Sequence, residues 1–302
     1  MRLWLWQVNM DSMGSMGSMD SMDSMDSMDP AFAPRAPDVS KCSVLGKGRG
    51  GGLPTPWRAL LLLLALWSLP LAAQEAPGLE VARIRFREID FDTAIVPLDR
   101  FRLHLLWQDE LGEPYYTLGA ARLSLEVREL RPLLVTNGGI YLPGFKPMGL
   151  HVEEGRQRVA LNRWHGGGNF FLAPNGVFFI EGGKAAIAET EAYHRAGHRP
   201  ELAVQSGPLL VIDGELHPKF RAESESAYLR NGVGVDRQGR VVFAISDEPV
   251  NFHTFASLFR ERLDCPNALY LDGNLSRMYL PALGRYDDGG PFAALLAVTA
   301  RQ

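Results

Sequence analysis

Cysteine is scarce in this chain, whose 302 residues include only Cys42 and Cys265. The two lie in regions of different composition, Cys42 in an atypical leading segment and Cys265 in the body of the chain. A body with one cysteine cannot form an internal disulfide once the leader is removed. The sequence therefore excludes a disulfide framework and a cysteine-rich zinc site.

The chain also lacks an excess of positive charge. Lys and Arg total 31 and Asp and Glu total 35, which gives a net charge of −4. Six of each group lie in residues 1–73, so 25 basic and 29 acidic residues remain downstream and carry the whole net charge. Nucleic-acid binding has no electrostatic support in such a body.

Several common catalytic motifs are missing as well. The glycines at 166–168 are not followed by Lys-Ser/Thr, and neither a G-x-S-x-G elbow nor an H-E-x-x-H zinc motif occurs. From the sequence we therefore expect no cofactor. It leaves open whether a metal, such as a structural divalent cation, is bound.

The first 56 residues are a different kind of polymer from the rest. Residues 10–29 repeat Met-Asp-Ser or Met-Gly-Ser triplets, and eight of the ten methionines lie within residues 1–73. Triplets of this kind present no apolar face that could be buried. We predict that residues 1–56 are low-complexity and disordered, or that the start of the chain is assigned too early.

Residues 57–73 have the pattern of a secretory signal peptide. Arg58 precedes an apolar run over 59–70, and small residues follow at Ala72 and Ala73. A membrane anchor or a buried helix is the alternative, but the run is shorter than an 18-residue span and ends at Pro70. We therefore expect a secreted or periplasmic protein that has no membrane association after signal removal.

Residues 74–302 alternate short apolar runs with turn signals. The apolar patterns predict strands at 79–86 and 101–107 and a helix at 252–263, capped by Asn251. The segment 117–130 fits either a strand or a helix, and its length favours a helix. Hairpins are expected at Asn175-Gly176, at Asp213-Gly214 and at 236–239. The prediction is one α+β domain of mixed, mostly antiparallel sheet with a few helices.

Polar and glycine residues cluster at the ends of these predicted strands. Such positions are where rigid scaffolds present reactive groups. Asp272 ends an apolar strand and suits acid/base, nucleophilic or metal-binding chemistry, whereas Arg230 could grip a phosphate. Plain turns and a surface ion pair are the alternatives for these motifs. The clusters lie at 137–141, 204–208, 229–235 and 267–276.

Taken in order, these segments resemble the phosphodiester glycosidase family. The matching pieces are NGGIY (137–141), GGGNFFLAPNGVFFI (166–180), VQSGPLLV (204–211), RNGVGVDRQGRVVFAIS (230–246), PVNFHTFASLFRERL (249–263) and CPNALYLDGNLSRMY (265–279). Many members carry Gly-Gly-Gly-Ser after the late Asp, whereas this chain has Gly273-Asn274-Leu275-Ser276. That departure predicts a less open pocket floor and a different substrate.

The resemblance implies that the domain at 74–302 hydrolyses a sugar-1-phosphodiester at its anomeric C–O bond. Asn137, Gly138, Arg230, Asp236, Asp272 and Gly273 match family positions. We assign catalysis to Asp272, as base or nucleophile, and to Asn137. The expected substrate-binding residues are Arg230, Asn231, Gly138, Gly139, Ser206, Gly207, Gly273 and Ser276.

The expected partner is a sugar-phosphate glycan, and the oligomeric state stays open. Two other classes compete with the enzyme. One is a non-catalytic envelope protein that binds phosphoglycan or peptidoglycan through the same groove, and the other is a structural β-rich module without a ligand. Recurring Asp, Arg and Asn at strand tips favour the enzyme.

Overall fold

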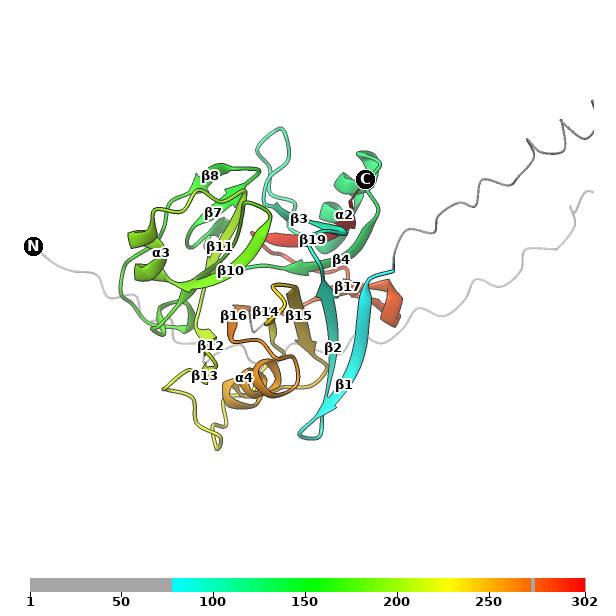
Figure 1. Ribbon diagram of the computed structural model, residues 1–302. Helices are drawn as coiled ribbons and strands as arrows, with labels where there is room; N and C mark the ends of the chain where they lie inside the picture. The colour runs from blue at the N-terminus through cyan, green and yellow to red at the C-terminus, as the bar shows by residue number, and fades with distance from the viewer. Residues whose placement is uncertain (1–77, 273–274, 302) are drawn as a thin grey trace, which may run out of the picture. The chain divides into compact units, whose positions relative to one another are not determined.

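The computed structural model describes residues 78–272 and 275–301, and in this part of the chain strands dominate over helices (Figure 1). Every strand pairing between these residues is antiparallel. The α+β prediction is therefore confirmed. The low-complexity segment and the signal peptide lie outside the described residues and stay predictions.

The largest sheet has seven strands in the order β1-β2-β15-β14-β16-β12-β13. Its central strands β15, β14 and β16 are almost entirely buried, because sheet or helix covers both of their faces. The strands span Glu80–Phe86 (β1), Ile89–Val96 (β2), Val241–Ser246 (β15), Asn231–Val235 (β14), Asn267–Asp272 (β16), Leu209–Ile212 (β12) and Glu215–Leu216 (β13).

Two five-stranded sheets accompany it, in the orders β10-β9-β11-β7-β8 and β18-β17-β4-β19-β3. The first contains Lys184–Glu189 (β10), Gly176–Glu181 (β9), Leu202–Ser206 (β11), His151–Glu153 (β7) and Arg156–Val159 (β8). The second contains Arg285–Tyr286 (β18), Met278–Leu280 (β17), Pro132–Asn137 (β4), Leu295–Ala300 (β19) and Phe101–Leu106 (β3). A short ribbon pairs Tyr141–Leu142 (β5) with Lys146–Pro147 (β6). Apolar side chains of all three larger sheets meet in one buried cluster.

Within residues 78–272 and 275–301, three α-helices lie outside this core, together with two 3-10 turns. They span Leu118–Val127 (α2), Thr190–Ala196 (α3) and Phe252–Glu261 (α4), with the 3-10 turns at Asn169–Phe171 and Pro281–Leu283. The predicted helix at 252–263 is α4, and Asn251 caps it by accepting a hydrogen bond from the Thr254 N–H. The ambiguous segment 117–130 is helix α2, with Thr117 as its N-cap. Both helix predictions are thus confirmed.

Two glycines of β14 let α4 pack directly on the largest sheet. A Cβ at Gly234 would lie 2.7 Å from the Cys265 Sγ and 2.8 Å from the Phe259 ring. At Gly232 it would lie 3.1 Å from the Phe255 ring. The G-V-G-V sequence therefore serves helix packing, and burial there raises the pKa of the Cys265 thiol.

Two of the three predicted hairpins occur. Asp213-Gly214 joins β12 to β13 with positive φ at both residues, and the turn at 236–239 joins β14 to β15. The hairpin at Asn175-Gly176 is wrong, because the turn that reverses β9 into β10 is Gly182-Gly183. The Asn175 side chain instead donates to the Phe170 carbonyl and accepts from the Thr190 hydroxyl.

None of the helices formed by residues 78–272 and 275–301 is both long enough and apolar enough to span a membrane.

Candidate active site

Asn137 and Asp272 meet where two sheets join. Asn137 ends β4 of a five-stranded sheet, and Asp272 ends β16 of the seven-stranded sheet. The Asn137 Nδ2 donates a 3.0 Å hydrogen bond to the Asp272 Oδ2. Asn137 is 1% exposed and Asp272 is half-buried. A buried amide therefore fixes the orientation of a carboxylate that solvent still reaches.

Asn231 fixes both partners from β14. Its Nδ2 lies 2.7 Å from the Asn137 carbonyl oxygen, 3.1 Å from the Asn137 Oδ1 and 2.9 Å from the Thr136 Oγ1. Its Oδ1 accepts from the Asp272 backbone N–H at 3.0 Å. The side chain of Asn231 thus joins β4 to β16 through an entirely buried amide.

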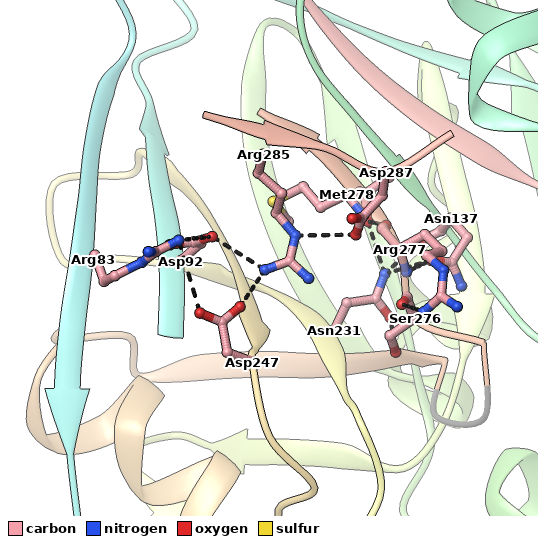
Figure 2. Close-up of polar contacts among 11 residues, drawn as sticks. Arg83, Asp92, Asn137, Asn231, Asp247, Ser276, Arg277, Met278, Arg285 and Asp287 are labelled. Carbon is pink, nitrogen blue, oxygen red and sulfur yellow. Dashed lines mark hydrogen bonds and ion pairs between the residues drawn. The ribbon is translucent and has the colours of Figure 1, made fainter. Parts of the chain in front are cut away.

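Ser276 and Arg277 complete the centre formed by Asn137, Asn231 and Asp272 from the connection between β16 and β17. The Ser276 hydroxyl lies 2.9 Å from the Asp272 carbonyl oxygen and 3.3 Å from the Asn231 Oδ1. The Arg277 N–H donates to the Asn137 Oδ1 at 2.9 Å (Figure 2). The Arg277 carbonyl accepts from the Thr136 hydroxyl at 2.8 Å. Asn137, Asn231, Asp272 and Ser276 are therefore brought together, as the sequence predicts.

The predicted glycines and Ser206 lie next to this centre in a supporting position. Ser206 donates to the carbonyl of Leu271, the residue before Asp272, at 3.0 Å. A Cβ at Gly138 would lie 2.9 Å from the Leu296 side chain, and one at Gly207 would lie 2.6 Å from the Phe170 carbonyl oxygen. Gly139 has a φ of +149°. Their substrate-binding role stays a prediction, and Gly273 lies outside the described residues.

Arg230 points toward aromatic side chains. It is completely buried, its Nε donates to the Val250 carbonyl at 2.7 Å, and its Nη2 donates to the Ser226 carbonyl at 3.0 Å. The Phe252 ring centroid lies 3.7 Å from the guanidinium carbon. Burial lowers the pKa of Arg230, and the neighbouring Tyr270 opposes that shift. No hydrogen bond joins the Arg230 side chain to Asn137 within the described residues, and its phosphate role stays a prediction.

The charge of Asp272 raises the pKa of two tyrosines. Burial raises the pKa of Tyr141, and the Asp272 carboxylate raises it further. Burial also raises the pKa of Tyr270, where Asp272 adds to the shift and Arg230 opposes it. Both phenols therefore stay protonated near neutral pH and lie within electrostatic reach of the carboxylate.

An ion-pair network holds the strands behind the centre in place (Figure 2). Arg285 contacts the buried Asp92 at 3.1 Å, Asp247 at 2.5 Å and Asp287 at 3.0 Å. Asp287 in turn accepts from the Met278 N–H at 3.0 Å. The carboxylates raise the pKa of Arg285 although burial opposes them. The network ties β2 of one sheet to β17 and β18 of another, directly after Arg277.

The described residues include no group of three or more His, Cys, Asp or Glu side chains arranged to hold a metal ion.

Four residues of this centre are absent from the sequence-based assignment: Thr136, Tyr141, Tyr270 and Arg277. Each lies inside or beside a segment that carries the family resemblance. Proximity to these segments is therefore the sequence feature that could have identified them. Thr136 and Arg277 were missed because their contacts form only when β4 pairs with β17. That pairing brings together residues at least 140 positions apart in the chain.

Similarity to known proteins identifies the class to which this fold and site belong. Residues 132–294 match the family model described as phosphodiester glycosidase. The chain is also 36% identical over 197 residues to the Escherichia coli (strain K12) protein "Uncharacterized protein YigE", covering 65% of this chain and 77% of that protein. This chain belongs to the phosphodiester glycosidase family.

The fold is also found among solved structures. The zebrafish N-acetylglucosamine-1-phosphodiester alpha-N-acetylglucosaminidase catalytic domain, auto-inhibited by its pro-peptide, matches with a TM-score of 0.50 and 16% identity. The match covers 76% of this chain and 85% of that one. At this identity the likeness concerns the fold alone.

Proposed function

We propose that this protein hydrolyses a sugar-1-phosphodiester of an extracytoplasmic glycan at the anomeric C–O bond. The observation that carries the proposal is the Asp272 carboxylate, held by the Asn137 amide at a junction of two sheets in a chain of this family. The signal-peptide pattern at 57–73 supports an extracytoplasmic location.

The geometry supports catalysis by one fixed carboxylate. The oxygen of water bonds to the anomeric carbon, the C–O bond breaks, and its electron pair stays on the departing phosphate oxygen. Asp272 either accepts the proton from water or attacks first and forms a glycosyl ester that water then hydrolyses. The leaving group is already a stable anion and needs no protonation, so a single carboxylate suffices.

Asn137 and Asn231 serve this reaction by holding the carboxylate still. A hydrogen bond from Asn137 to the Oδ2 leaves the orientation of the Oδ1 defined as well. The Asn231 contact to the Asp272 backbone N–H fixes the end of the strand that carries the carboxylate. Positioning of this kind lowers the entropic part of the barrier.

The direct test is incubation of the full-length protein with a panel of nitrophenyl-phosphoryl sugars in H₂¹⁸O, followed by mass spectrometry. Cleavage at the anomeric carbon releases nitrophenyl phosphate that contains no ¹⁸O. Incorporation of ¹⁸O into that product would mean P–O cleavage and would contradict the proposal. Binding without release of sugar from any member of the panel would favour the non-catalytic envelope protein instead.

The first prediction concerns Asp272→Asn, which keeps the size of the side chain and removes its charge. We expect kcat to fall by about 10²- to 10⁴-fold, the range for loss of an acid/base group. Asp99→Asn is the matched control, because Asp99 is an exposed carboxylate in the turn between β2 and β3. Activity of the Asp272 variant within a few-fold of wild type would exclude Asp272 as the catalytic carboxylate.

A further inference from the structure

Among the buried and half-buried arginines of the described residues, two differ from the others in how their charge is balanced. Six described arginines are buried or half-buried: Arg122, Arg230, Arg240, Arg260, Arg277 and Arg285. Four of them have a carboxylate within 4.0 Å. Arg230 and Arg277 form no ion pair within residues 78–272 and 275–301. A cation withdrawn from water is costly unless other groups or a ligand compensate it.

The surroundings of Arg230 already compensate its charge. Two carbonyl oxygens accept from its guanidinium, and the rings of Tyr228, Phe252 and Tyr270 lie 5.4, 3.7 and 5.3 Å from the guanidinium carbon. Cation–π contacts of this kind are attractive, most of all away from water. These carbonyls and rings offset the charge of Arg230 without an ion pair, although its buried Nη1 has no hydrogen-bond partner within the described residues.

Arg277 has far fewer partners. Its side chain makes one hydrogen bond within the described residues, from Nη1 to the Ser276 carbonyl at 3.0 Å. A guanidinium has five N–H donors in a planar fork, so most of its donor capacity remains for a ligand. Its backbone is fixed at both the N–H and the carbonyl, by the side chains of Asn137 and Thr136.

We propose that Arg277 binds the phosphoryl oxygens of the substrate and thereby makes the site selective for phosphodiesters over neutral glycosides. The inference deepens the proposed function and rests on it. A phosphodiester monoanion entering beside the Asp272 carboxylate meets a like charge, and a planar guanidinium that contacts two phosphate oxygens offsets that repulsion. The same contact becomes stronger as the leaving phosphate gains a second negative charge.

The test uses nitrophenyl phosphate as the probe, because it is the product of the model substrate and needs no turnover. Calorimetric titration gives its Kd with the wild type, Arg277→Gln, Arg277→Lys and Arg156→Gln. Arg156 is the matched control, an exposed arginine of β8 without an ion pair in the described part of the chain. We expect Arg277→Gln to weaken binding by about 10- to 100-fold, the usual effect of losing hydrogen bonds to a charged group. We expect an intermediate loss for Arg277→Lys and none for Arg156→Gln.

The outcomes separate this inference from the proposed function. If the wild type cleaves phosphodiesters but Arg277→Gln binds the probe as tightly as wild type, the inference is wrong and the proposed function stands. Probe binding that depends on Arg277, in a protein that cleaves no substrate, supports the anion site and contradicts the hydrolase. If the wild type does not bind the probe, the inference fails. If Arg277→Gln does not fold, Arg277→Lys decides, because full affinity with a lysine would overturn the forked contact.

Discussion

At the scale of single residues, the site depends on one amide. Asn231 was predicted to bind substrate, but its Nδ2 and Oδ1 both contact other groups of the protein. Since it is completely buried, its donors and acceptor replace contacts that water would otherwise make. In the described structure, the Asn231 side chain positions Asn137 and Asp272.

Replacing Asn231 with Ala should therefore lower both stability and activity. The change leaves the Asp272 N–H without its partner and removes the donor to Asn137, at a cost of about 1–3 kcal/mol in the free energy of unfolding. Urea denaturation measures the first effect and kcat the second. Asn231→Asp is the informative companion, because it keeps the acceptor for the Asp272 N–H and removes the donor to β4. Unchanged kcat in both variants would show that Asn231 does not position the carboxylate.

The sequence indicated which polar residues meet, whereas the roles assigned to them stay predictions. Asn137, Asn231, Asp272 and Ser276 could be predicted because polar residues at the ends of buried strands gather at sheet edges. Side-chain direction could not be predicted. Arg230 directly precedes Asn231, the first residue of β14, and the two side chains point in opposite directions, so only Asn231 reaches the centre.

At the scale of elements, apolar periodicity gave two of the three α-helices that the described residues form, and turn chemistry gave two of three hairpins. Helix α3 was not predicted from the sequence. The stripe of Phe255, Ala256 and Phe259 is buried, as a helix of period 3.6 requires. The hairpin at Asn175-Gly176 failed because Asn175 has tertiary partners for both its amide donor and its acceptor. Two glycines a few residues later supply the positive φ angles that a tight turn needs.

The N-cap of α4 is a test at this scale. Asn251→Ala removes the acceptor for the Thr254 N–H and should cost about 0.5–2 kcal/mol of unfolding free energy. The Asn251 Nδ2 also donates to the carbonyls of Ala222 and Ser224. Asn251→Asp keeps the cap and loses these donors, so chemical denaturation of both variants separates the two contributions. Equal losses for Ala and Asp would mean that the cap itself contributes nothing.

At the scale of the whole molecule, the predicted α+β class and the family are confirmed, whereas the arrangement of three sheets could not be read from the sequence. The order of strands in a sheet depends on which buried faces fit one another. Short apolar runs have similar sequences, so the sequence does not show which of them pair. β3 illustrates the difficulty, because its partner β19 lies almost two hundred residues away along the chain. The His104–Thr299 contact between these strands, at 2.9 Å, is buried.

His104 makes stability depend on pH. Burial, and to a lesser extent the charges of Arg102 and Arg128, lower its pKa from 6.5 to about 4. The unfolded chain therefore binds a proton at a pH where the folded chain does not. Stability is complete above about pH 6.5 and falls as the pH drops toward 4, by about 3 kcal/mol in total.

Denaturation curves between pH 4 and 7 measure this loss. His104→Gln keeps a hydrogen-bonding group near Thr299 and does not titrate, so its stability should depend less on pH than that of the wild type. His165→Gln removes an exposed histidine and should leave the wild-type dependence in place. Identical pH profiles for wild type and His104→Gln would show that His104 is not the group responsible.

The order β17-β4-β19 has a consequence for how the protein is made. β4 ends at Asn137, but the strands on either side of it begin at Met278 and Leu295. During synthesis both edges of β4 stay without these partners until more than one hundred further residues have left the ribosome. Unpaired apolar edges are sites of aggregation, so these edges are open to aggregation until the last strand is complete.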